Sequence, residues 1–175
     1  MGYSIELYFD RQFETKIRLL WTQLAESGVP SILHKIGSRP HISLAVLDTI
    51  DVGQVVNLLD AFSQESSSFC LEFSAIGLIP GDLQSVFLAP VPTSALLEMQ
   101  SALYRLLQDH GCLPRDHYKP NLWLPHCTIS KELIASDALK TVGMCQAGSV
   151  IGMAHIIELG LIEFRPRKKI KGFVL

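Results

Sequence analysis

The sequence feature that most constrains the fold is an order of predicted elements that occurs twice along the 175-residue chain. In each half, hydrophobic periodicity predicts a strand, a helix, a polar connector, a strand introduced by Pro-His, a helix and a strand. The pairs Pro40-His41 and Pro125-His126 lie about half the chain length apart. This arrangement is typical of a degenerate internal duplication. We therefore expect a single domain over residues 1–175, made of two pseudo-repeats at about 1–82 and 83–175.

The first half contains clear strand and helix signals. Residues 3–9 alternate between two sets of side chains, which predicts a strand with one buried face. Asp10 is expected to cap a helix that extends to about Ser27, and an amphipathic helix capped by Asp51 reaches about Phe62. The other predicted strands of this half are His41–Leu47 and about Phe69–Ile79.

The second half repeats this order. Its predicted helices are Thr93–His110 and a weaker one near Leu133–Val142. Its predicted strands are Gln84–Ala89, the segment Trp123–Ile129, and about Ile151–Phe164 and Ile170–Leu175. A basic turn, Arg165 to Lys169, joins the last two strands. The basic cluster Arg165 to Lys171 is expected to form an exposed hairpin tip, with RNA contact as the alternative.

Both Pro-His strands carry the same short motif, Pro-His-x-[Ser/Thr]-apolar. Residues two apart on a strand share a face, so His41 projects beside Ser43, and His126 projects beside Thr128. A single motif of this kind is weak evidence for function. Two copies at matching positions of a repeated order of elements predict a functional site.

The two motifs together suit phosphoryl chemistry. An imidazole titrates near neutral pH and can give or take a proton, and a hydroxyl can donate a hydrogen bond to a phosphate oxygen. Two such pairs would supply one base, one acid and two phosphate donors. This scheme needs no metal and no cofactor. The residues leave open which histidine is the base and which is the acid.

The paired motifs resemble those of the 2H phosphoesterases, also called the 2'-5' RNA ligase-like or RNA 2',3'-cyclic phosphodiesterase family. The resemblance implies an α+β fold that is bilobed and pseudo-twofold, with two antiparallel sheets around a central cleft and helices packed outside. It also implies hydrolysis of 2',3'-cyclic, related cyclic or 2'-5' phosphodiesters of RNA ends or nucleotides. The family's histidines fall on His41 and His126, and its hydroxyls fall on Ser43 and Thr128.

Two other functions are considered beside the enzyme. The first is a non-catalytic nucleotide-binding module with the same fold, which need not keep both proton-transfer groups. The second is an interaction scaffold, which needs no pocket. A zinc site is disfavoured because the Cys and His residues of the second half fit no standard ligand spacing. The chain also lacks the Gly-x-Ser-x-Gly sequence of the serine hydrolases and a Walker-type phosphate loop.

Four residues near the motifs are possible substrate-binding residues. Arg39 and Lys119 precede the two histidine strands and could steer an anionic substrate, although such cations also occur in solvated loops. Tyr118 and Trp123 could stack on a base. Trp123 is equally compatible with a place in the core.

Composition restricts the partners. The formal net charge is −2, whereas a protein that grips long nucleic acid carries a basic excess, so no extended nucleic-acid surface is expected. No stretch is predicted to span a membrane and no targeting signal opens the chain. We expect a cytoplasmic monomer whose four cysteines are free thiols and whose substrate is a nucleotide or an RNA end.

Overall fold

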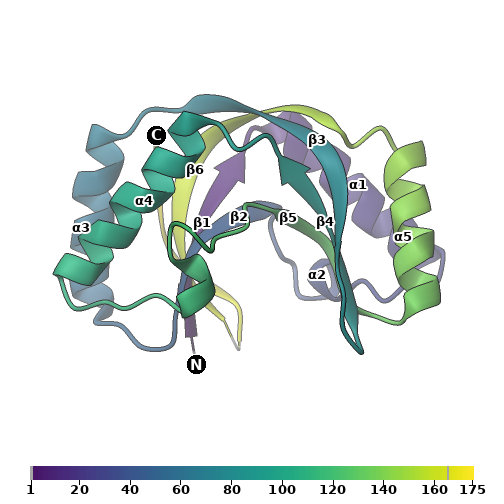
Figure 1. Ribbon diagram of the computed structural model, residues 1–175, viewed down its shortest axis with the longest axis horizontal. Coiled ribbons are helices and arrows are strands. Elements are labelled where there is room, and N and C mark those ends of the chain that lie inside the picture. The colour runs from purple at the N-terminus through teal and green to yellow at the C-terminus, as the bar shows by residue number, and fades with distance from the viewer. Residues whose placement is uncertain (1, 165) are drawn as a thin grey trace.

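The expected α+β fold is present in the computed structural model, which describes residues 2–164 and 166–175 (Figure 1). The strands are β1 (Gly2–Phe9), β2 (His41–Leu47), β3 (Phe69–Ile79), β4 (Gln84–Pro90), β5 (Cys127–Leu133), β6 (Gly152–Phe164) and β7 (Lys168–Val174). The helices are α1 (Arg11–Glu26), α2 (Ile32–Lys35), α3 (Val52–Glu65), α4 (Ser94–Asp109), the 3-10 helix η1 (Asp116–Tyr118) and α5 (Ala135–Ala147).

The described strands form one antiparallel sheet in the order β2-β1-β6-β3-β4-β5, with β7 added to β6. The two antiparallel sheets that the family resemblance implies are therefore two lobes of one continuous sheet. The joint is a ladder between Phe69–Phe73 of β3 and Gly152–Ile156 of β6. This joint is possible because β3 has 11 residues and β6 has 13, so each strand pairs with different partners at its two ends.

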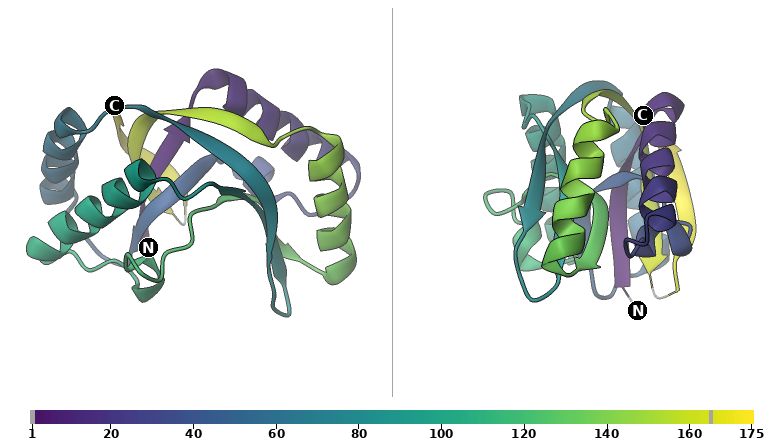
Figure 2. Two further views of the ribbon diagram at one scale, coloured as in Figure 1. Left: turned by 45° about the horizontal axis from the view of Figure 1, so that its top comes forward. Right: turned by 90° about the vertical axis from the view of Figure 1, so that its right-hand side faces the viewer.

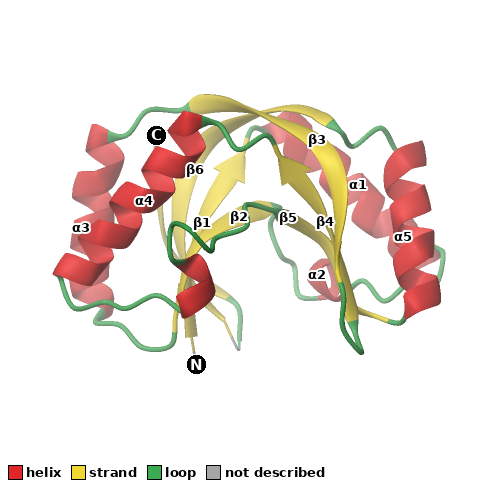
Figure 3. Cartoon of the chain, viewed as in Figure 1, coloured by secondary structure: helices red, strands yellow, loops and turns green. Residues whose placement is uncertain are grey.

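Each lobe combines elements from both halves of the chain. Strand β3, from the first half, pairs with β4, and strand β6, from the second half, pairs with β1. Figure 1 and the left view of Figure 2 show β3 and β6 crossing from one side of the molecule to the other. The helices follow the same exchange, since α1 packs with α5 and α3 packs with α4, one pair on each side (Figure 3).

The helices form where the capping and apolar patterns predict them. Asp10 caps α1 by accepting hydrogen bonds from the amides of Gln12 and Phe13, and Asp51 caps α3 by accepting one from Gln54. The predicted apolar face of α1 is buried, and it comprises Phe13, Ile17, Leu20, Trp21 and Leu24. Sequence periodicity missed only short helices in the polar connectors, α2 and η1, because four or three residues are too few to show a helical period.

One expectation about β1 is wrong. The strand was expected to bury a single face, yet its opposite face, Ser4, Glu6 and Tyr8, is only 4%, 2% and 1% exposed. That face is covered by two segments distant in sequence. The connector before β2 places Arg39 over the Tyr8 ring, and the β6–β7 turn brings Arg167 to Glu6.

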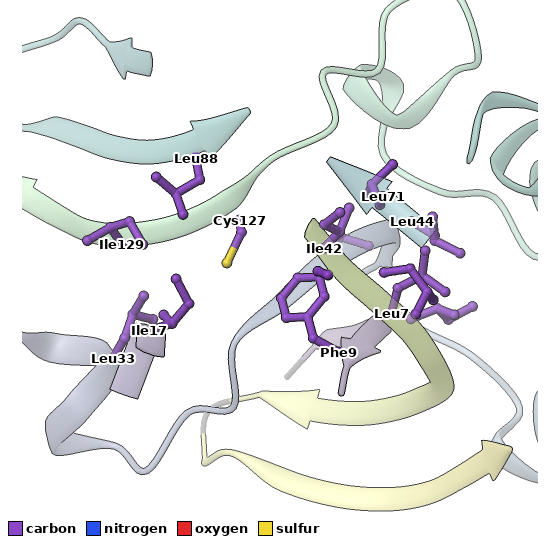
Figure 4. Close-up of a cluster of buried hydrophobic side chains, with 14 of the residues drawn as sticks. Leu7, Phe9, Ile17, Leu33, Ile42, Leu44, Leu71, Leu88, Cys127 and Ile129 are labelled. Carbon is purple, nitrogen blue, oxygen red and sulfur yellow. The ribbon is translucent and has the colours of Figure 1, made fainter. Parts of the chain in front are cut away.

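The two ends of the strand order, β2 and β5, meet each other. In Figure 1 they lie together in the middle of the arch that the sheet forms. Figure 4 shows the Cys127 side chain among the buried aliphatic side chains that come from both lobes, such as Ile42 and Ile129. The Pro-His segments of the two halves are therefore brought to one place. Among the described residues, no helix is both long and apolar enough to cross a membrane.

Candidate active site

The two motif histidines occupy the junction where β2 and β5 meet. His41 is the first residue of β2, and His126 immediately precedes β5. The backbone of His41 acts on the pKa of the thiol of Cys127, the residue after His126, so the two motif segments are close together. Charge on His41 lowers the pKa of His126, which is an effect of their proximity. Both side chains are half-buried.

Both imidazoles are held in the same way. Nδ1 of His41 is 2.6 Å from the carbonyl oxygen of Arg39, and Nδ1 of His126 is 2.7 Å from the carbonyl oxygen of Leu124. Each carbonyl belongs to the residue two positions before its histidine. Because a carbonyl only accepts, each Nδ1 carries the proton and donates. In the neutral ring, Nε2 is then the nitrogen that can take a proton.

Each motif hydroxyl lies two residues after its histidine, Ser43 in β2 and Thr128 in β5. Ser43 and Thr128 are both half-buried. The Ser43 oxygen accepts a hydrogen bond from the Ser4 hydroxyl at 3.3 Å. Thr128 stands opposite Phe87 of β4. Each lobe thus presents one imidazole and one hydroxyl.

His126 has an apolar environment. Its ring and the Phe87 ring pack at an interplanar angle of 63°, with centroids 5.3 Å apart. Burial lowers the pKa of His126 below its ordinary value, and the nearby His41 and His117 lower it further, against the opposing hydrogen bond to Leu124. The environment of His126 therefore favours the neutral ring, which can act as a base.

His41 has a very different neighbour. The carboxylate of Glu6 lies with Oε1 3.4 Å from Nε2 of His41. Tyr8 donates a hydrogen bond to Oε2 of Glu6 at 2.7 Å, and Nη2 of Arg167 lies 2.9 Å from the same oxygen. Burial, together with the charge of Glu6, raises the pKa of Tyr8, so this phenol remains a neutral donor.

Sequence reasoning missed Glu6. Alternation places Glu6 on the same face as Tyr8, but only the register of β1 on β2 brings it beside the histidine motif, opposite Ser43. That register shifts at Ile5 and Glu6, and an irregularity of this kind has no signal in the alternation pattern. The partner Arg167 lies 161 residues away in the chain.

The four possible substrate-binding residues have other partners in the structure. Arg39 bridges Glu14 at 2.7 Å and Glu158 at 2.5 Å. Lys119 is half exposed and pairs with the exposed Asp116 within its own loop.

The two aromatic residues of that set are both 8% exposed. Nε1 of Trp123 donates to the Ser43 carbonyl at 3.0 Å, so Trp123 joins the connector before β5 to β2. The backbone carbonyl of Tyr118 accepts a hydrogen bond of 2.6 Å from the buried Gln100 of α4. Burial of Tyr118 raises the pKa of its phenol, and the Ser43 side chain, hydrogen-bonded to that phenol, opposes the shift.

The basic turn is not simply an exposed hairpin tip. Arg165 lies outside the described residues. Three cations of the following segment are paired with carboxylates: Arg167 with Glu6, Lys169 with Glu158 at 2.6 Å, and Lys171 with Asp60 at 2.9 Å. A pocket of about 240 Å³ lies between this turn and the connector before β2, lined by Tyr8, Ile36, Gly37, Arg39, Ile162, Arg167 and Lys169.

Metal ligation and thiol chemistry find little support. Within residues 2–164 and 166–175, no group of three or more His, Cys, Asp or Glu side chains is placed to hold a metal ion. Cys127 is fully buried, and burial raises the pKa of its thiol to about 12. It therefore stays protonated and is a poor nucleophile.

Comparisons with known proteins agree with this geometry. A family model described as the 2'-5' RNA ligase superfamily matches residues 16–156. No curated protein sequence gives a significant match. Similar solved structures include apo LigT of E. coli, with a TM-score of 0.66 and 15% identity over 99% of this chain and 96% of that chain.

Two further structures extend the comparison. TT0787 of Thermus thermophilus has a TM-score of 0.63 and 13% identity over 100% of this chain and 98% of that chain. Usb1 of Kluyveromyces marxianus with uridine monophosphate has a TM-score of 0.53 and 12% identity over 99% and 97% of the two chains. These identities support the fold alone. The family model, however, covers most of the sequence, so the resemblance to the 2H phosphoesterases is confirmed and the chain belongs to the 2'-5' RNA ligase superfamily.

Proposed function

We propose that this protein is a metal-independent phosphoesterase. Its proposed substrates are 2',3'-cyclic, related cyclic or 2'-5' phosphodiesters of nucleotides or RNA ends. The observation that carries the proposal is the shared tether of the two imidazoles, which fixes the proton on each Nδ1 and leaves each Nε2 for proton transfer. Membership of the superfamily supports it. Nucleotide complexes of similar folds, such as LigT with 3'-AMP and with ATP, support a nucleotide ligand.

The reaction needs two proton transfers at one phosphorus atom. Nε2 of one imidazole takes a proton from water, and the water oxygen forms a bond to phosphorus. The bond from phosphorus to one ribose oxygen breaks, and the other imidazole protonates that oxygen. The product is a phosphomonoester. Ser43 and Thr128 donate hydrogen bonds to the two non-bridging oxygens and so stabilise the charge that develops there.

The environments of the two rings support a proposal for their separate roles. His126, whose pKa is lowered by burial, is the proposed base because it is neutral in the resting enzyme. His41 is the proposed acid. The carboxylate of Glu6 is placed to accept a hydrogen bond from a proton on Nε2 of His41.

The test is a screen of 2',3'-cyclic mononucleotides, oligonucleotides with a cyclic phosphate end and 2'-5' linked dinucleotides. Turnover is followed by product analysis after dialysis against a chelator. We expect a monoester product and activity that survives chelation. A positioned acid or base contributes ~10²–10⁴-fold, so His41→Ala and His126→Ala should each lose at least about 100-fold.

Further variants sharpen this test. The double histidine variant should lose less than the product of the single losses, because both groups act in one transition state. Ser43→Ala and Thr128→Ala should be milder, because each removes one donor and no proton carrier. Nucleotide binding without any turnover would instead support a non-catalytic binding module. Full activity in either histidine variant would refute the mechanism.

A further inference from the structure

A buried carboxylate stands at the proposed phosphate site. Glu6 is 2% exposed, and its Oε1 is 3.4 Å from Nε2 of His41. A phosphate oxygen that is hydrogen-bonded to this Nε2 lies about 2.6–3.2 Å from it, and therefore within about 7 Å of the carboxylate. Charges at this distance in a poorly hydrated site interact strongly. Any phosphate held by His41 is thus subject to the charge of Glu6.

The second lobe shows that the architecture does not require this carboxylate. Glu6 stands opposite Ser43 in the ladder of β1 and β2. The corresponding residue opposite Thr128, in the ladder of β4 and β5, is Phe87. One motif therefore has a carboxylate beside it and the other has a phenyl ring. Burying a carboxylate is costly, so its place next to one histidine calls for a functional explanation.

The charges around the site nearly cancel. Arg167 pairs with Glu6, and the other two cations of the adjoining pocket, Arg39 and Lys169, are both paired with Glu158. Arg39 is also paired with Glu14, which in turn is paired with Arg18. Few positive charges are therefore left without a carboxylate partner to face a phosphate at this site.

We propose that Glu6 makes the site selective for phosphate groups with a single negative charge. Phosphodiesters, cyclic or open, carry one charge, whereas phosphomonoesters carry nearly two at neutral pH. The second charge of a monoester adds repulsion from Glu6, and Arg167, which is already paired with Glu6, offsets this repulsion only in part. Because hydrolysis converts a diester into a monoester, Glu6 would also favour release of the product. This inference rests on the proposed function, since it assumes that His41 contacts the phosphate.

The test compares two ligands that differ in one methyl group and one charge. They are 2'-deoxyadenosine 3'-(methyl phosphate) and 2'-deoxyadenosine 3'-monophosphate, with affinities measured by calorimetry above neutral pH. Glu6→Gln should tighten binding of the monoester by roughly tenfold and change the diester less. Arg167→Gln should act in the opposite direction, because it removes the cation that compensates Glu6.

A matched control is Asp60→Asn. Asp60 is paired with Lys171 at 2.9 Å, and Lys171 does not line the pocket beside the site. The ratio of the two affinities should stay unchanged in this variant.

The outcomes separate this inference from the proposed function. If Glu6→Gln folds and keeps the wild-type ratio of affinities, Glu6 does not determine selectivity. This outcome would not contradict the proposal that the protein hydrolyses cyclic phosphates. If Glu6→Gln does not fold, Arg167→Gln decides, and an unchanged ratio there overturns the role equally. A wild-type protein that binds neither ligand and hydrolyses no cyclic phosphate would overturn both proposals.

Discussion

The two histidines share a backbone tether but differ in what surrounds their free nitrogens. Phe87 lies against His126, and Glu6 lies against His41. A phenyl ring offers no hydrogen-bond acceptor and no opposite charge, whereas a carboxylate can partner an imidazolium. The backbone holds the two histidines in the same way, but their neighbours differ chemically. This asymmetry suits a reaction with one base and one acid.

This asymmetry predicts the pH dependence of the rate. The base must be neutral, so kcat/KM rises as pH increases through the pKa of His126. Since burial and neighbouring charges lower that pKa, the midpoint of the rising limb should lie below pH ~6.5, the ordinary histidine value. A falling limb should follow as the acid loses its proton, and both midpoints belong to the coupled pair. Steady-state rates between about pH 4.5 and 9 provide the measurement.

One variant tests whether the rising limb of the pH–rate profile belongs to His126. Phe87→Ser exposes His126 to water and removes part of the cause of its lowered pKa, so the rising limb should move to higher pH. If the limb stays in place in this variant, or if the wild-type midpoint lies well above pH ~6.5, the assignment of His126 as the base is wrong.

At the scale of residues, the sequence was enough to predict those site residues that follow the two-residue period of a strand. The spacing of two along a strand placed each histidine beside its hydroxyl. It could not show which carbonyl holds each ring, because that depends on the path of the chain before the strand. Glu6 was missed for a related reason, since the groups that bury it, Tyr8 apart, come from distant segments.

At the scale of elements, two glycines let aromatic rings lie flat on the sheet. The Tyr8 ring occupies the space where a Cβ of Gly160 would stand, and the Phe87 ring does the same at Gly77. These rings flank Glu6 and His126 respectively. The absence of a side chain in β6 and β3 is therefore part of how the site is shaped.

A pair of glycine substitutions tests this packing. Gly160→Ala forces the new methyl group into the Tyr8 ring and should destabilise the fold by roughly 1–3 kcal/mol. Gly143→Ala is the control, because Gly143 lies in α5 with nothing within 4 Å of the added Cβ. It should stabilise the fold by about 0.5–1 kcal/mol, as expected for alanine in an exposed helix position. Urea denaturation measures both, and equal effects would contradict the packing argument.

Element boundaries were predictable where local signals are strong. Strand β3 and strand β2 coincide with the predicted ranges, and α1 begins directly after its Asp10 cap. The short α2 and η1 were not predicted, because they depend on how the connectors pack. The helix α5 extends five residues beyond the predicted Val142, since its weak amphipathic pattern gave no clear end.

At the scale of the whole molecule, the resemblance to the family implied two lobes, but neither it nor the repeated order of elements predicted the exchange of strands between them. Whether β3 stays with its own half or joins β4 depends on pairing between distant strands, and hydrophobic alternation carries no information about such partners. The exchange has a functional consequence. It brings the two ends of the strand order together, and this juxtaposition unites the histidine motifs.

The exchange also predicts that the two lobes unfold as one unit. Separating them breaks the ladder between β3 and β6, the contacts between β2 and β5, and the hydrogen bond from Trp123 to the Ser43 carbonyl. Losing these contacts exposes core from both lobes, so a state with one lobe folded is unfavourable.

The two tryptophans report on different parts of the molecule. Trp21 lies in α1. Trp123 lies in the segment between η1 and β5, and its side chain is hydrogen-bonded to the Ser43 carbonyl of β2. In each single-tryptophan variant, Trp21→Phe and Trp123→Phe, the fluorescence change should coincide with the loss of far-ultraviolet circular dichroism across a urea titration. Both probes should give the same midpoint and the same slope within a variant. Two resolved transitions, with one tryptophan exposed before the secondary structure is lost, would show that the lobes are separate folding units despite their shared strands.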